Sequence, residues 1–156
     1  LIIFQKETSM TGLPQSEHPK EKLFDFMTTP VISIDVKATV QEAAHLMEVE
    51  NASAILITEN GKHTGIITER DFTRKVVGCG LPLSTLVSDI MSQPLYTLDK
   101  NNHILEASEF MIDHNTRHIT VTDQDKVVGI ITVKNTFAYY MNLFGLGSYD
   151  PNTNAD

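Results

Sequence analysis

One segment of this chain occurs twice, and this repeat limits the possible folds more than any other feature of the sequence. Residues 27–30 (Met-Thr-Thr-Pro) return as residues 91–94 (Met-Ser-Gln-Pro), 64 positions later, and the spacing holds without a gap to residues 73 and 137. The identical pairs include Asp35/Asp99, Glu42/Glu106, Ala43/Ala107, Met47/Met111, Asn51/Asn115, Thr58/Thr122, Lys62/Lys126 and the four pairs from Gly65/Gly129 to Thr68/Thr132. A chain of 156 residues is long enough for two small repeats with a shared core, so we expect two similar units.

Each repeat predicts the element order β-α-β-β-α. Mostly apolar residues at i, i+3, i+4 and i+7 predict helices that begin at Val40 and Ile104 and bury one face. Residues 54–58 and 119–122 are rich in β-branched side chains, and turn residues separate them from second strands at 64–68 and 127–132. The fold class is therefore α/β (α+β), with two pseudo-symmetric repeats.

The helix starts differ between the repeats. Thr39 and Glu42 form a capping-box pattern, in which each side chain accepts a backbone N–H of the other residue. His103 stands at the position of Thr39 in the second repeat, so we expect a weaker cap there.

The loss of periodicity sets the expected boundaries. Residues 78–83 (Gly-Cys-Gly-Leu-Pro-Leu) are rich in helix breakers and form the predicted linker. The expected organisation is an N-terminal tail, a first repeat, this linker, a second repeat and a C-terminal tail, at residues 1–17, 18–77, 78–83, 84–144 and 145–156.

Composition narrows the setting. The net charge of −8 disfavours binding to nucleic acid or to an anionic membrane surface. No apolar run approaches the roughly 20 residues that span a bilayer, and no secretory signal is visible at the start. The single cysteine, Cys79, cannot form an internal disulfide, which is typical of a reducing compartment. We expect a cytoplasmic protein with no membrane or nucleic-acid partner.

The sequence offers no catalytic or metal-binding pattern. The six histidines are scattered, without a His-Glu-x-x-His helix or a cysteine pair. Cys79 has no neighbouring histidine to act as its base, and no nucleophile-elbow, phosphate-loop or dinucleotide-binding pattern occurs. We therefore expect no enzyme activity, no metal and no required cofactor.

The segment Gly-Ile-Ile-Thr-Glu-Arg-Asp at 65–71, which leads from a strand into a helix, carries groups suited to a nucleotide. The Asp71 carboxylate can accept hydrogen bonds from both ribose hydroxyls, Thr68 can reach a phosphate, and Arg70 can pair with its charge. Thr-x-x-Asp is also a helix-capping pattern, so a purely structural role stays open.

The second copy of this segment has lost the carboxylate. Thr132 and Lys134 stand at the positions of Thr68 and Arg70, but Asn135 replaces Asp71. An amide offers one acceptor oxygen and a donor instead of acceptors only, so we expect weaker ribose binding there. Lys134 still favours a phosphate.

Residues 20–140 resemble a tandem pair of cystathionine-β-synthase (CBS) domains, through the two Met-Thr/Ser-x-Pro starts and the Gly-Ile-Ile-Thr-x-x-Asp ending. This resemblance implies two repeats packed sheet to sheet, a Bateman module. It also implies two clefts between the repeats that bind adenosine derivatives such as AMP, ADP, ATP or S-adenosylmethionine. The expected function is regulatory sensing of such a ligand. A structural or oligomerisation module without a ligand is the alternative.

The resemblance further implies that each cleft takes one wall from the other repeat, against which adenine would lie. The cleft at Asp71 would be walled by residues 91–96, and the expected contacts are Met91, Ser92, Pro94, Leu95 and Tyr96. The cleft at Asn135 would be walled by residues 27–32, through Thr29, Pro30, Val31 and Ile32. Arg117 and His118, which match Ser53 and Ala54, would lie near the phosphates. A solvated pair at a turn is an equally open interpretation.

Two partners follow from the resemblance. Modules of this type commonly pair through their helices, and Phe137, Tyr140 and Phe144 supply apolar side chains in the last helix. We therefore expect a homodimer, with a regulated protein as a possible further partner.

Overall fold

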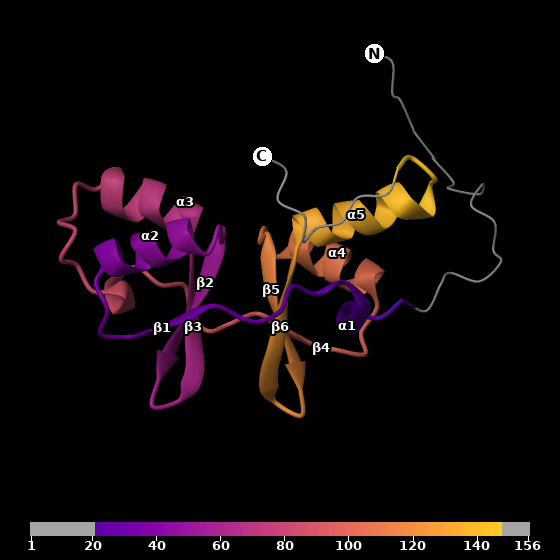
Figure 1. Cartoon of the computed structure of the whole chain (residues 1–156), viewed down its shortest axis with the longest axis horizontal. Helices are drawn as coiled ribbons and strands as arrows, with labels where there is room; N and C mark the ends of the chain where they lie inside the picture. The colour runs from indigo at the N-terminus through magenta and orange to yellow at the C-terminus, as the bar shows by residue number, and fades with distance from the viewer. Residues whose placement is uncertain (1–20, 148–156) are drawn as a thin grey trace, which may run out of the picture.

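The computed structural model describes residues 21–147 and consists of two three-stranded sheets, each with helices on its outer side (Figure 1). The predicted tail at 1–17 and residues 148–156 of the other tail lie outside this range. The first repeat comprises α1 (Leu23–Phe26), β1 (Ser33–Asp35), α2 (Val40–Val49), β2 (Ala54–Glu59), β3 (Lys62–Thr68) and α3 (Glu69–Asp71), which continues as the π-helical turn η1 (Phe72–Val77). The second comprises the 3₁₀ turn η2 (Val87–Asp89), β4 (Thr97–Asp99), α4 (Ile104–Asp113), β5 (His118–Asp123), β6 (Lys126–Thr132) and α5 (Val133–Leu143). The predicted β-α-β-β-α order is confirmed.

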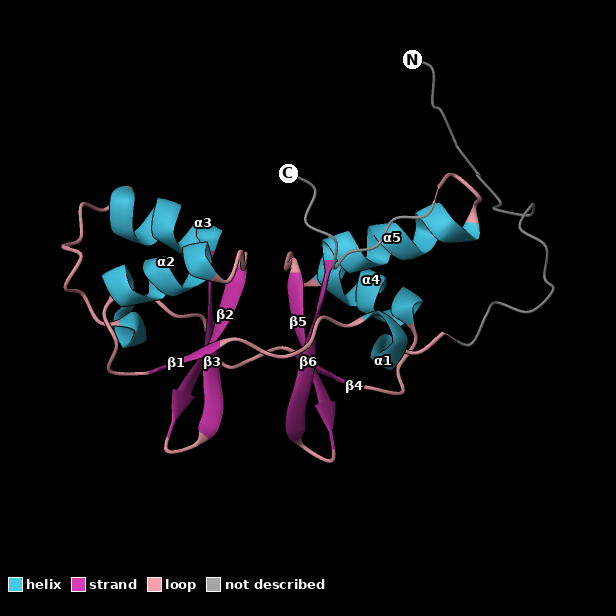
Figure 2. Cartoon of the chain, viewed as in Figure 1, coloured by secondary structure: helices cyan, strands magenta, loops and turns pink. Residues whose placement is uncertain are grey.

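The two sheets have the same topology (Figure 2). The first strand of each repeat pairs in parallel with the second, and the second pairs antiparallel with the third. Both hairpins turn through residues with positive φ, at Asn60-Gly61 and at Gln124-Asp125. These are the predicted turns, and two consecutive left-handed residues match the right-handed twist of the strands.

The capping difference between the repeats is present. Thr39 Oγ1 accepts the N–H of Glu42 at 3.2 Å, and the Glu42 carboxylate accepts the N–H of Thr39 at 2.8 Å. At α4 the Glu106 carboxylate accepts the N–H of His103 at 2.7 Å, while the His103 side chain caps no backbone group.

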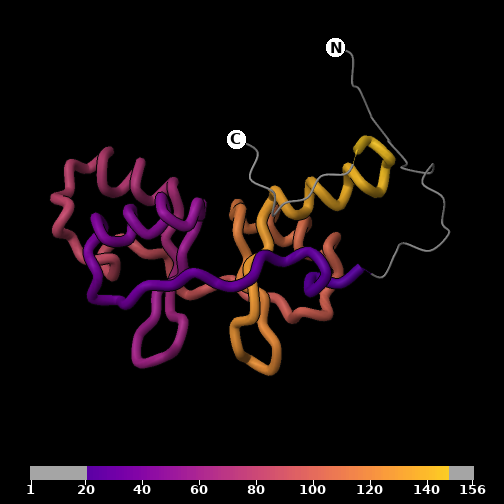
Figure 3. The backbone as a smooth tube through the Cα atoms, in the orientation of Figure 1, coloured from indigo at the N-terminus to yellow at the C-terminus, as the bar shows by residue number. Residues whose placement is uncertain are grey.

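Each repeat contributes its first element to the core of the other. Leu23 of α1 is fully buried in the second core, between α4 and the second sheet, while Val87 and Ile90 around η2 are buried in the first core. The chain between α1 and β1 therefore crosses from one repeat to the other, as does the chain between η2 and β4 (Figure 3). Hydrogen bonds fix both crossings, since Thr28 pairs with Ile130 of β6 and Ser92 pairs with Ile66 of β3.

No helix between residues 21 and 147 is both long enough and apolar enough to cross a membrane.

Candidate ligand-binding clefts

Two cavities lie between the repeats. The Asp71 cleft has a volume of about 330 Å³, and the Asn135 cleft has a volume of about 840 Å³. Both volumes fall in the range of roughly 300–1,000 Å³ that is typical of small-molecule sites.

The Asp71 cleft combines groups from both repeats. Among the residues singled out in the sequence, it is lined by Ser53, Thr68, Arg70, Asp71, Ser92, Pro94, Leu95, Tyr96, Arg117 and His118. The crossing explains this composition, because Ser92 is bonded to β3 of the first repeat before the chain continues to β4 of the second. Met91 does not line the cleft, since its side chain packs against Gly65 instead.

The Asn135 cleft is built in the equivalent way. Of the expected residues, Pro30, Val31, Ile32, Ser53, Ala54, Thr132, Lys134 and Asn135 line it. Thr29 does not. Arg117 and His118, which the repeat alignment places in the other cleft, also line this one.

The helix ends that complete both clefts were not among the predicted site residues. Glu48, Glu50 and Asn51 at the end of α2 line the Asn135 cleft, and His114, Asn115 and Thr116 after α4 line the Asp71 cleft. The signal was the identical pair Asn51/Asn115. Each asparagine has a φ of 48°, which ends its helix in the left-handed conformation and directs the chain to the next strand.

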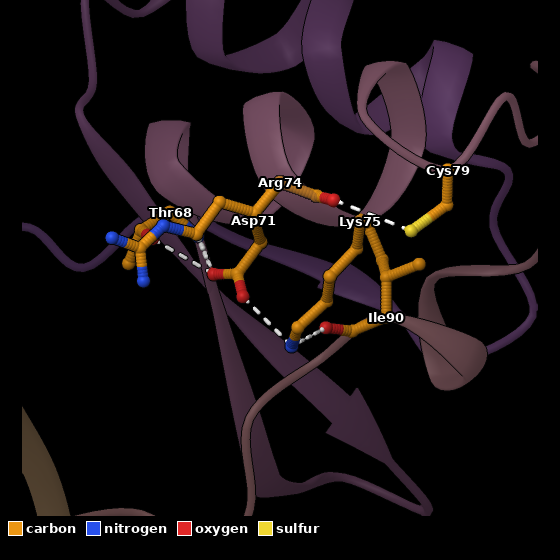
Figure 4. A network of polar contacts seen from close by, with 6 residues as sticks. All are labelled: Thr68, Asp71, Arg74, Lys75, Cys79 and Ile90. Atoms are coloured by element: carbon orange, nitrogen blue, oxygen red, sulfur yellow. Dashed lines mark hydrogen bonds and ion pairs between the residues drawn. The ribbon is translucent and has the colours of Figure 1, made fainter.

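Asp71 is 8% exposed and already has partners (Figure 4). Its Oδ2 accepts the N–H and the hydroxyl of Thr68, both at 2.8 Å, and its Oδ1 lies 2.8 Å from Nζ of Lys75. Lys75 also donates to the carbonyl of Ile90, and nearby the Cys79 thiol donates to the carbonyl of Arg74 at 3.4 Å. The Thr-x-x-Asp pattern therefore forms a helix cap. Oδ1 keeps capacity for one more donor, because a carboxylate oxygen accepts two bonds.

Asn135 occupies the same place without a charge. It is fully buried, its Oδ1 accepts the N–H of Thr132 at 2.7 Å, and its Nδ2 donates to Thr28 Oγ1 at 3.4 Å. Tyr139 replaces Lys75 one turn further along the helix and packs edge-on against Phe26, with ring centroids 5.4 Å apart. Asp71 therefore has the ammonium group of Lys75 as a partner, whereas an aromatic residue stands at the position of that lysine in the repeat of Asn135.

Four residues line both clefts: Ser53, Glu69, Arg117 and His118. We call this set the shared wall. It joins the starts of β2 and β5, where Ser53 Oγ lies 3.2 Å from His118 Nε2. Burial first, then the nearby Arg117 and Arg70, lower the pKa of His118 to about 4, while Asp71 opposes the shift. The imidazole is therefore neutral at pH 7 and acts as a hydrogen-bonding group only.

The Asp71 cleft offers cations and an aromatic surface. Neither Arg70 nor Arg117 forms a salt bridge within the described part of the chain. Tyr96 is 44% exposed and contacts His114 edge-on at a centroid distance of 5.1 Å. Unpaired guanidinium groups suit an anion, and an exposed aromatic face suits a planar base.

Two pseudo-symmetric repeats, joined by crossing segments and enclosing composite clefts, define a tandem-repeat module of the ligand-binding type. The sequence pattern of the CBS domain matches residues 23–78 and 87–141, and the chain belongs to the CBS domain family. It is 34% identical over 124 residues to the CBS domain-containing protein YhcV of Bacillus subtilis (strain 168), covering 80% of this chain and 89% of YhcV.

Two solved structures share the fold. The CBS domain protein PAE2072 from Pyrobaculum aerophilum, complexed with AMP, superposes with a TM-score of 0.69 at 23% identity, over 74% of this chain and 89% of that one. The CBS domain pair of MJ0100, in complex with 5′-methylthioadenosine and S-adenosyl-L-methionine, gives a TM-score of 0.70 at 24% identity, over 81% and 98% of the two chains.

Proposed function

We propose that this protein is a regulatory module that binds an adenosine derivative between its two CBS repeats. The observation that carries the proposal is the Asp71 cleft, where a carboxylate, an aromatic wall and two guanidinium groups face one cavity, and neither guanidinium forms a salt bridge with residues 21–147. The adenosine ligands in the structures of PAE2072 and MJ0100 support the ligand class.

The roles follow from chemistry. A ribose hydroxyl would donate to Oδ1 of Asp71, beside Lys75, and adenine would lie against the wall formed by Pro94, Leu95 and Tyr96. Arg70 and Arg117 would pair with phosphate oxygens, because charge-assisted bonds to guanidinium are the strongest available to an anion. AMP, ADP, ATP and S-adenosylmethionine are the candidate effectors.

Regulation requires that the ligand bind two arrangements of the repeats unequally. A molecule in either cleft touches both repeats, so its binding energy depends on their relative position. We further propose that a homodimer transmits this change. Ile112 on α4 is 78% exposed. Phe137 on α5 and Phe144 directly after α5 are each 58% exposed. A second copy of the chain could cover these side chains. Light scattering tests this proposal, and a mass near 17.4 kDa at all concentrations would contradict it.

One observation favours the alternative of a structural module without a ligand. Within the described chain, Thr68 and Lys75 make all the hydrogen bonds and ion pairs of the Asp71 side chain. The Thr-x-x-Asp pattern can therefore be explained without a ligand.

A thermal-shift panel with AMP, ADP, ATP and S-adenosylmethionine separates the two functions. A ligand at 100 times its dissociation constant adds roughly 2.7 kcal/mol to the unfolding free energy, and we expect this with at least one compound. Absence of any shift at millimolar concentrations would favour the structural module.

A further inference from the structure

We propose that Arg117 serves both clefts as a shared phosphate-binding group, so that the chain tightly binds one phosphorylated adenosine ligand and takes a phosphate-free adenosine derivative in the Asn135 cleft. This inference rests on the proposed function and assigns a ligand class to each cleft.

The first observation is a break in the symmetry of the repeats. Arg70 of the first repeat has a basic counterpart, Lys134, so each cleft has one cation of its own. At the start of the middle strand the match fails, because Arg117 in the second repeat corresponds to Ser53 in the first. A symmetric pair would carry two such arginines, and this chain carries one.

The geometry explains how one arginine reaches both clefts. Ser53 is small and its hydroxyl lies 3.2 Å from His118 Nε2, so the starts of β2 and β5 lie next to each other. No long side chain stands at position 53, and both Arg117 and His118 line the Asn135 cleft as well as the Asp71 cleft. The Asn135 cleft is also the larger cavity, at about 840 Å³ against about 330 Å³.

The charges around the clefts allow Arg117 to bind a phosphate in only one of the two clefts at a time. The shared wall contains one cation, Arg117, beside one carboxylate, Glu69, and a neutral His118. A phosphate monoester carries a charge of about −1.5 to −2 at pH 7. When such a group in the Asp71 cleft pairs with Arg70 and Arg117, the Asn135 cleft keeps Lys134 against Glu48, Glu50 and Glu69.

A second phosphate would therefore meet a net negative surface and the first phosphate across the shared wall. Two phosphates on either side of this wall would repel each other, and the opposing cation is already engaged. An uncharged or sulfonium derivative of adenosine avoids both penalties. Its adenine can still use the apolar wall formed by Val31, Ile32 and Ala54.

Calorimetric titration with two probes, AMP and 5′-methylthioadenosine, tests the proposal on the full chain. We expect one tight AMP site, a second AMP at least about tenfold weaker, and unhindered binding of 5′-methylthioadenosine to protein that holds AMP in the tight site only. Ser53→Arg supplies the missing guanidinium and should tighten the second AMP about tenfold, whereas the uncharged control Ser53→Gln should not.

Arg117→Ser gives an independent measurement if Ser53→Arg fails to fold. This variant should lower AMP affinity at least about tenfold and leave 5′-methylthioadenosine affinity unchanged. Two equal AMP sites in the wild type, or an unchanged ratio of AMP to 5′-methylthioadenosine affinity in Arg117→Ser, would overturn the sharing while leaving the proposed function intact. Failure of both probes to bind the wild type would overturn this assignment of ligands, and the proposed function itself is refuted only if the whole thermal-shift panel also shows no shift.

Discussion

The sulfur of Met91 lies directly above Gly65, so that a Cβ added to this glycine would be 2.5 Å from Sδ. Met27 and Gly129 form the same pair in the second repeat, also at 2.5 Å. In each pair the methionine belongs to a crossing segment and the glycine to the strand on which that segment is bonded. The methionine and the glycine that occur at equivalent positions of both repeats therefore form the same contact between repeats at two places.

Gly65→Ala should destabilise the fold by about 1–3 kcal/mol, because the new methyl group forces the Met91 side chain and the Ser92 carbonyl to move. The loss should shrink when Met91→Ala is added, since the clash partner is then gone. Urea unfolding of the two single variants and the double variant gives the coupling energy. Strictly additive losses would mean that the contact is not the reason for the glycine.

Asn135→Asp should lower the free energy of unfolding by about 1–3 kcal/mol or more. The substitution places a carboxylate in a fully buried position without the lysine partner that Asp71 has. Adding Tyr139→Lys recreates the i, i+4 pair and should recover part of the loss. The reciprocal change Asp71→Asn should cost less, because Lys75 is 41% exposed and stays hydrated. Thermal unfolding of all three variants checks this order, and a stable Asn135→Asp single variant would refute the pairing argument.

His118 should make the fold sensitive to mild acid. Its pKa is lowered from 6.5 to about 4, so the unfolded chain binds a proton at a pH where the folded chain does not. The free energy of unfolding should therefore be unaffected above pH 6.5, fall as the pH drops toward 4, and level off below that value. This contribution is at most about 3 kcal/mol.

His118→Asn removes the titrating group but keeps a partner for Ser53, and comparison with the wild type cancels the effects of the acidic residues. Chemical unfolding from pH 8 to pH 4 should show that the wild type loses more stability than His118→Asn as the pH falls. Parallel curves of unfolding free energy against pH for the two proteins would mean that His118 does not cause the acid sensitivity.

Local pattern was sufficient for the strands and for the longer helices of this fold, but not for α1 or η2. The 3.6-residue period that begins at Val40, the β-branched runs and the Asn60-Gly61 turn depend on neighbouring residues only, and each predicts its element. The exchange of α1 and η2 between the two cores could not be predicted from local pattern. Leu23 and Val87 are apolar in either arrangement, and nothing local says which sheet they cover.

The residues of the clefts were likewise predictable only in part. Family resemblance predicted that Asp71 and Tyr96 line one cavity, although they are distant in sequence. The ion pair of Asp71 with Lys75 was available from the i, i+4 spacing alone. The shared wall was not, because the contact between Ser53 and His118 exists only once the two repeats are packed together.

Titration of AMP into the wild type, Asp71→Ala and Asn135→Ala tests the central claim most directly. Asp71→Ala should weaken AMP at least about tenfold, since a hydrogen bond to a charged group contributes about 1.5–3 kcal/mol, and Asn135→Ala should weaken it less. Circular dichroism should verify that both variants are folded. Unchanged AMP affinity in a folded Asp71→Ala variant that has lost about 1 kcal/mol of stability would contradict nucleotide binding by Asp71 and leave it the role of a helix cap.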